Sequence, residues 1–266
     1  MTPSPIVDIH THAWTDMLAP RAVGQLSESS GLKAYHDGTV AGLDGERRRA
    51  GVDFCVVQPV ATKPTQVRTI NDWAASVQTD RIRCFGAMHP EFEDPSAEIA
   101  RVRALGMRGI KLHTEYQTFH PDEERMAPVY EACVENGLVV LFHAGEDEFL
   151  PTLYGRCESF VRMLDRWPGL TAVLAHMGGY RQWKQVTCEL LGRDCYLDTS
   201  YALGHMPDDD FLDMVQRHGA ERVLFGSDSP WDDMKAQLER CRALPLPPDD
   251  RDAILGGNAA RLLGLQ

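Results

Sequence analysis

The hydrophobic residues of the chain gather in eight short runs that are rich in β-branched side chains. The runs cover residues 5–9, 52–57, 82–87, 107–112, 138–142, 171–175, 195–199 and 223–227. From the second run onward they start about 24 to 33 residues apart, roughly the length of one strand followed by one helix. Continuous apolar runs of this length are typical of parallel strands that are buried on both faces. The pattern therefore predicts eight buried parallel strands.

Between these runs the apolar residues recur at helical spacing. One predicted helix opens with acidic residues at 122–124 and ends at Asn136-Gly137. Its apolar face is formed by Met126, Val129, Tyr130, Cys133 and Val134. Segments around residues 160–164, 183–191 and 211–215 each carry a similar face. Helices are thus predicted to alternate with the strands.

Eight strands that alternate with helices close most simply into an α/β fold of the (β/α)8 TIM-barrel type, which we predict as a single domain over residues 1–266. A doubly wound open sheet is the alternative, but it would usually carry a glycine-rich phosphate turn after its first strand. This chain carries His10-Thr11-His12 there instead. The longest connection, residues 13–51, is interpreted as a loop over the site.

Charge and composition argue against several kinds of partner. The net charge of −12 would repel phosphate backbones, and the sequence has no long basic stripe, so we expect no nucleic-acid partner. No apolar run is long enough for a membrane span, and the first residues lack an export signal. We therefore expect a cytoplasmic protein that acts on a small molecule without a membrane partner. Assembly into a homo-oligomer stays open.

The seven cysteines are dispersed and include no Cys-x-x-Cys pair. Cys55, Cys84 and Cys195 fall inside predicted strands. This distribution predicts reduced thiols in the core, and neither disulfide bonds nor metal ligands.

Potential metal ligands lie where the predicted strands end. His10 and His12 close the first strand and share one face, because side chains alternate along a strand. His89 follows the third strand, His113 the fourth, His143 the fifth, His176 the sixth and Asp228 the eighth. A single histidine in such a position is more often a packed core residue, but the strands of a barrel converge at this end. We therefore expect one or two divalent cations to be surrounded by His10, His12, His143, His176 and Asp228.

Five strand-end motifs and a closing helix resemble those of one known family. The motifs are His10-Thr11-His12, Gly109-Ile110-Lys111-Leu112-His113, Leu141-Phe142-His143-Ala144-Gly145, Ala175-His176-Met177-Gly178-Gly179 and Phe225-Gly226-Ser227-Asp228-Ser229-Pro230. In this order they resemble the amidohydrolase superfamily, and in particular its amidohydrolase-related branch, which also holds aminocarboxymuconate-semialdehyde decarboxylase. The segment 257–263 resembles the closing helix of that family, so the resemblance runs from residue 6 to residue 263.

The resemblance implies roles for individual residues. His10, His12 and His143 would bind the metal, Asp228 would be both ligand and acid/base, and His176 would be a ligand or an electrostatic helper. Lys111 would either be carboxylated and bridge two metals, or remain an ammonium that binds a substrate carboxylate. Its sequence context, Ile110-Lys111-Leu112-His113, favours one metal ion over two.

Three histidines and a carboxylate suit Zn²⁺, with Mn²⁺ or Fe²⁺ as alternatives, and leave room for a water whose pKa zinc lowers to about 7. The favoured reaction is hydrolysis of an amide, lactone or ester of a small molecule, in which this water attacks the carbonyl-type carbon. The alternative is a decarboxylase or other lyase that acts on an aromatic or unsaturated carboxylate, since the same ligands serve both reactions. A metal-binding protein without catalysis is a third reading. A phosphoesterase fits less well, because only one acidic ligand candidate is found.

Overall fold

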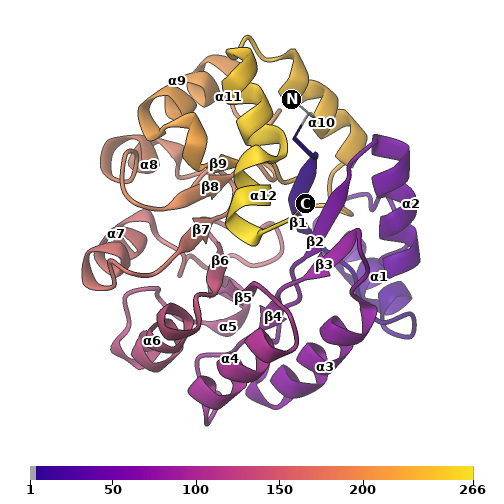
Figure 1. Cartoon of the computed structure of the whole chain (residues 1–266), viewed down its shortest axis with the longest axis vertical. Coiled ribbons are helices and arrows are strands. Elements are labelled where there is room, and N and C mark those ends of the chain that lie inside the picture. The colour runs from indigo at the N-terminus through magenta and orange to yellow at the C-terminus, as the bar shows by residue number, and fades with distance from the viewer. Residues whose placement is uncertain (1–3, 266) are drawn as a thin grey trace. The chain divides into compact units, whose positions relative to one another are not determined.

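The computed structural model describes residues 4–265 (Figure 1). These residues form two compact units. The first unit contains residues 4–57, 79–83 and 198–265, and the second contains residues 58–78 and 84–197. In each unit parallel strands alternate with helices along the chain. The single domain predicted from the sequence stays a prediction.

The strands of the first unit are β1 (Val7–Thr11), β2 (Phe54–Val57), β3 (Ile82–Cys84) and β9 (Val223–Leu224). Strand β2 lies between β1 and β3, and β1 runs parallel to β2 with Val7 opposite Phe54. On the other side of β1, Ile9 N donates a hydrogen bond of 2.9 Å to Phe225 O, just after β9. The helices are α1 (Ala19–Ser30), α2 (Val40–Ala50), α9 (Asp208–His218), α10 (Met234–Ala243), α11 (Pro248–Asp252) and α12 (Asn258–Leu263).

The second unit is built on β4 (Gly86–Ala87), β5 (Gly109–His113), β6 (Val139–His143), β7 (Ala172–Leu174) and β8 (Tyr196–Asp198), whose last residue, Asp198, belongs to the first unit. These strands are parallel and neighbour one another in chain order. The register of β5 and β6 places His113 directly opposite His143. The helices are α3 (Val67–Val77), α4 (Pro95–Ala104), α5 (Thr114–Gln117), α6 (Ala127–Asn136), α7 (Cys157–Arg166) and α8 (Trp183–Glu189).

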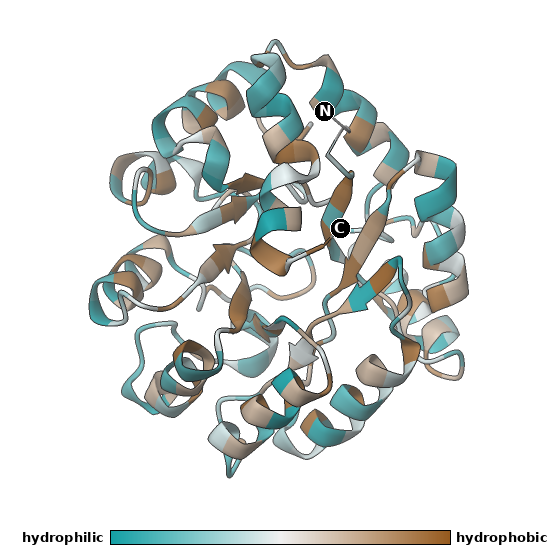
Figure 2. Cartoon of the chain, viewed as in Figure 1, coloured by the Kyte–Doolittle hydropathy of each residue, from teal (hydrophilic) through white to brown (hydrophobic). Residues whose placement is uncertain are grey.

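Each of the eight predicted runs contains a strand, and the third run is divided between β3 and β4. All five residues of β1, of β5 and of β6 are buried, as expected for parallel strands covered on both faces. Figure 2 shows the strands mostly in the hydrophobic colour, whereas the helices carry both hydrophilic and hydrophobic residues. The burial of the strands in the core thus determines where the residues at their carboxyl ends lie, among them His113 and His143.

The connection 13–51 is not the plain loop that was predicted, because it contains α1 and α2. Helix α2 begins after Thr39, whose side chain accepts a hydrogen bond from Gly42 N, and ends at Gly51 with a left-handed φ of 73°. Gly42 and Gly45 lie inside this helix, and glycine is a poor helix former. Their presence is what made the segment look like a loop.

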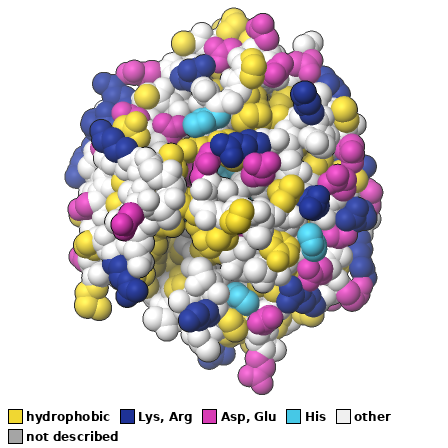
Figure 3. Space-filling view, turned by 180° about the vertical axis from the view of Figure 1, so that it is seen from behind, with side chains coloured by type: hydrophobic (Ala, Val, Ile, Leu, Met, Phe, Trp, Pro, Cys, Tyr) yellow, Lys and Arg dark blue, Asp and Glu magenta, His cyan; other side chains and the backbone are white. Residues whose placement is uncertain are grey.

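Acidic and basic side chains are interspersed on the face of the molecule seen in Figure 3. The absence of a nucleic-acid partner stays a prediction. None of the helices in residues 4–265 combines the length and the apolar character that a membrane span needs.

All seven cysteines are free thiols, and six of them are buried. Burial raises the pKa of the Cys84 thiol, and likewise that of the Cys241 thiol, to about 12. Cys188 on α8 is exposed. These positions agree with the predicted reduced core, with Cys188 as the exception.

We expect one thiol per native chain to react quickly with Ellman's reagent at pH 8, because thiolates react and buried thiols are both inaccessible and protonated. Absorbance at the thionitrobenzoate band measures the reaction. Cys188→Ser should remove the fast phase, and denaturant should expose the remaining thiols. A second fast-reacting thiol in the folded Cys188→Ser variant would contradict the buried assignment.

Candidate metal centre

In the first unit, β1 and the segment after β9 bring His10, His12 and Asp228 together. Asp228 N donates a hydrogen bond to His10 O at 2.9 Å, and His12 N donates one to Ser229 O at 2.6 Å. These two bonds join the segments directly beside the histidines. Asp228 has a left-handed φ of 63°, a conformation that aspartate tolerates better than most residues. The backbone thus holds the Asp228 carboxylate against both imidazoles.

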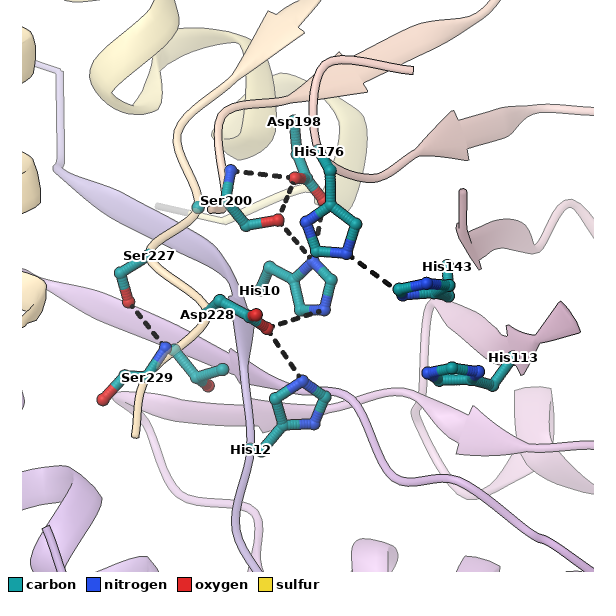
Figure 4. A network of polar contacts seen from close by, with 12 residues as sticks. His10, His12, His113, His143, His176, Asp198, Ser200, Ser227, Asp228 and Ser229 are labelled. Carbon is teal, nitrogen blue, oxygen red and sulfur yellow. Dashed lines mark hydrogen bonds and ion pairs between the residues drawn. The ribbon is translucent and has the colours of Figure 1, made fainter. Parts of the chain in front are cut away.

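One carboxylate oxygen lies next to both rings (Figure 4). Asp228 Oδ1 is 3.1 Å from His12 Nε2 and 3.4 Å from His10 Nε2. The three side chains offer one potential ligand atom each, and these atoms all lie within 4.8 Å of one another. His10 is buried, whereas His12 and Asp228 are partly accessible. The group is therefore sheltered but not closed off from solvent.

The hydrogen bonds of His10 fix its tautomer. His10 Nδ1 lies 2.9 Å from Asp198 Oδ2, and because a carboxylate oxygen only accepts, Nδ1 must carry the proton. In the neutral ring Nε2 then holds the lone pair, and it lies 3.4 Å from Asp228 Oδ1. Two imidazole nitrogens with a carboxylate oxygen suit Zn²⁺, Mn²⁺ or Fe²⁺. The residues present fit such an ion.

Asp8, a fully buried carboxylate on β1, lies two residues before His10. Asp8 Oδ1 accepts hydrogen bonds from Ser227 N at 3.0 Å and from His10 N at 3.1 Å. Burial raises the pKa of Asp8 to about 7, against the lowering effect of the hydrogen bonds from Ser227 and His10. Asp8 thereby ties β1 to the segment that carries Asp228.

In the second unit, the ends of β5, β6 and β7 carry His113, His143 and His176. The rings of His113 and His143 stack in parallel, with centroids 4.1 Å apart. His176 Nε2 lies 3.1 Å from His143 Nδ1 (Figure 4). His176 has a left-handed φ of 59°, and its carbonyl oxygen accepts a hydrogen bond from Trp183 Nε1. Two predicted site residues, His143 and His176, therefore contact each other directly.

Asp147 completes a second potential ligand group with His113 and His143. Its Oδ2 is 3.5 Å from His113 Nε2 and 3.9 Å from His143 Nε2. His143 Nε2 donates to Glu146 O, and His113 Nδ1 accepts from Tyr116 N, so the neutral rings of both histidines carry their proton on Nε2. A protonated nitrogen cannot bind a metal ion. In these tautomers the Nε2 atoms of His113 and His143 therefore suit the Asp147 carboxylate better than a cation. With its proton on Nε2, His143 accepts a hydrogen bond from His176 Nε2 through Nδ1.

Lys111 lies in β5 and is 1% exposed, which is unusual for a lysine. It shares a strand face with His113, two residues further on. A buried position suits either predicted role, because a lysine removed from water needs an anionic partner or must lose its charge. The roles of Lys111, His143 and His176 stay predictions.

The sequence analysis did not identify three residues that contact the candidate ligands: Asp147, Asp198 and Ser200. Asp198 occupies a strand end in the seventh predicted run, which is the signal that singled out the histidines and could have found it. Asp147 lies in a loop, where hydrophobic periodicity carries no information.

Comparisons with known proteins identify the family of this chain. A family model described as amidohydrolase matches residues 7–265. A search of curated proteins found no match.

Solved structures of several proteins have the same fold as this chain. An uncharacterised TIM-barrel protein of Bordetella bronchiseptica has a TM-score of 0.81 and 23% identity, with 98% of this chain and 99% of that chain covered. The 5-carboxyvanillate decarboxylase of Sphingomonas paucimobilis has a TM-score of 0.74 and 20% identity, with 98% and 99% covered. A dihydroxybenzoic acid decarboxylase of Polaromonas, solved with bound manganese and the inhibitor 2-nitroresorcinol, has a TM-score of 0.76 and 17% identity, with 98% and 97% covered. These likenesses confirm the predicted TIM-barrel fold class.

Proposed function

Because this chain belongs to the amidohydrolase family, a family of enzymes, we propose that it is a metal-dependent decarboxylase of a small aromatic carboxylate. The observation that carries this proposal is that several structural neighbours are decarboxylases, of 5-carboxyvanillate in one case and of dihydroxybenzoates in others. They favour the alternative reaction over hydrolysis, which is supported only at the level of the family.

His10, His12 and Asp228 would hold the divalent ion, and the family resemblance implies His143 as a further ligand. Manganese is bound in the Polaromonas neighbour, whereas zinc remains our expectation from the donor set. The ion would supply Lewis acidity that polarises an oxygen of the substrate and stabilises negative charge on it.

Asp228 would be the residue that moves a proton, because its carboxylate is partly accessible and lies beside the nitrogens that would hold the ion. Its Oδ1 is 3.1 Å from His12 Nε2 and 3.4 Å from His10 Nε2. We assign to Asp228 the delivery of a proton to the ring carbon that bears the carboxylate. The carbon–carbon bond then breaks, its electron pair returns to the ring, and carbon dioxide leaves. The acid is restored by a proton from solvent.

We expect the metal-loaded protein to release carbon dioxide from at least one ortho-hydroxybenzoate in a panel of such acids. A coupled bicarbonate assay measures the release, and mass spectrometry identifies the decarboxylated product. The methyl ester of each acid is the matched control, because it keeps the ring and lacks the carboxylate. Turnover of esters, lactones or amides without carbon dioxide release would overturn decarboxylation in favour of hydrolysis.

A further inference from the structure

Asp198 and Ser200 lie at the edge of the His10 ring that carries Nδ1, away from the ligand atom Nε2. We propose that they form a positioning pair that holds His10 in its Nδ1–H tautomer and thereby sets the affinity of the centre for its divalent ion. This inference rests on the metal centre of the proposed function. It assigns no direct contact with substrate to either residue.

The hydrogen bonds around Asp198 leave little freedom. Its Oδ2 accepts from His10 Nδ1 at 2.9 Å, and its Oδ1 accepts from Ser200 N at 3.0 Å and from Ser200 Oγ. Because the Ser200 hydroxyl donates to Asp198, its oxygen is left to accept from His10 Nδ1, which lies 2.9 Å away. The Nδ1 proton is thus shared by two acceptors. Asp198 and Ser200 are fully buried and His10 is 1% exposed, so water does not compete.

Only a carboxylate satisfies all of these donors. Asparagine at position 198 would have one oxygen for the same three donors, so its amide group would face either His10 or Ser200. An amide N–H that faces His10 would turn Nδ1 into an acceptor and move the ring proton to Nε2. The atom that faces Asp228 would then donate a proton and could not bind a metal ion as a neutral imidazole.

The segment that carries the pair is tied to the segment that carries Asp228. Thr199 N donates to Leu224 O at 2.9 Å, and Thr199 Oγ1 donates to Gly226 O at 3.0 Å. Gly226 passes so close to His10 that a Cβ atom there would lie 2.9 Å from the Cβ of His10. These contacts hold the pair, the ring and the Asp228 carboxylate in a fixed relation within one unit.

The test is the zinc affinity of the metal-free full-length protein, measured by competition with a chromophoric chelator. We expect Asp198→Asn to weaken zinc binding by about 10- to 100-fold, and Ser200→Ala to weaken it by roughly tenfold. Asp213→Asn is the matched control, since that carboxylate lies on α9 and is exposed, and it should bind as the wild type does. In ¹⁵N-histidine-labelled metal-free protein, the His10 proton should move from Nδ1 toward Nε2 in Asp198→Asn.

These readouts separate positioning from a merely structural role, which would lower the thermal midpoint without moving the ring proton. Folded Asp198→Asn that binds zinc like the wild type overturns the inference while the proposed function stands. Wild-type protein that takes up no zinc overturns both. Should Asp198→Asn not fold, Ser200→Ala decides, because unchanged zinc affinity in that variant also overturns the inference.

Discussion

Asp228→Asn is expected to lower kcat for carbon dioxide release by about 10³-fold, within the range for losing a positioned general acid. The amide cannot deliver a proton to the substrate carbon, and it is a weaker metal ligand than a carboxylate. Asparagine also tolerates the left-handed backbone at this position, so the fold should be retained. Initial rates on the best hydroxybenzoate, together with metal content and circular dichroism, measure the effect.

Asp213→Asn is again the control. It removes the same charge from an exposed residue that belongs to neither potential ligand group, so the rate should be unchanged. Metal-loaded Asp228→Asn that works at the wild-type rate would remove Asp228 from the proton transfer. A loss of rate that added metal repairs completely would reduce its role to that of a ligand.

Removal of the metal should have a comparable effect. Lewis acid stabilisation contributes several kcal/mol, so chelation is expected to lower the rate by about 10² to 10⁴-fold, and added Zn²⁺ or Mn²⁺ should restore it. Elemental analysis should find about one divalent ion per native chain, as the one-ion prediction states, and markedly less in His10→Gln and His12→Gln. These variants remove the two imidazoles that face Asp228 Oδ1.

His205→Gln is the control for the metal prediction, because His205 is a partly exposed histidine that belongs to neither potential ligand group. About two ions per chain would instead support a carboxylated Lys111 as a bridge. A native chain that neither contains metal nor takes it up would contradict the whole centre.

Much of the fold follows from the hydrophobic pattern, because burial on both faces leaves a plain signal in strands such as β5 and β6. The pattern is weaker at the ends of elements. Val134 was predicted to lie on an apolar helix face, yet it is 44% exposed. It lies eight residues after Met126, which at 100° per residue is about 80° away from Met126 around the helix.

The candidate site was predictable only in part. The strand-end rule singled out His10, His12 and Asp228, and the structure brings these three side chains together. Tautomers were beyond the sequence, since the proton of His10 is fixed by Asp198, a partner 188 positions away. The choice between hydrolysis and decarboxylation was also beyond it, because one ligand set serves both reactions. That choice depends on the substrate that the loops admit.

The left-handed backbone at Asp228 also restricts how this centre can be re-engineered. Glutamate carries the same acid on a longer side chain, but it has no comparable tolerance for positive φ, so a saturation library at this position should yield folded clones chiefly with aspartate, asparagine or glycine. Directed evolution toward a new substrate would therefore have to keep Asp228 and introduce its substitutions at other positions.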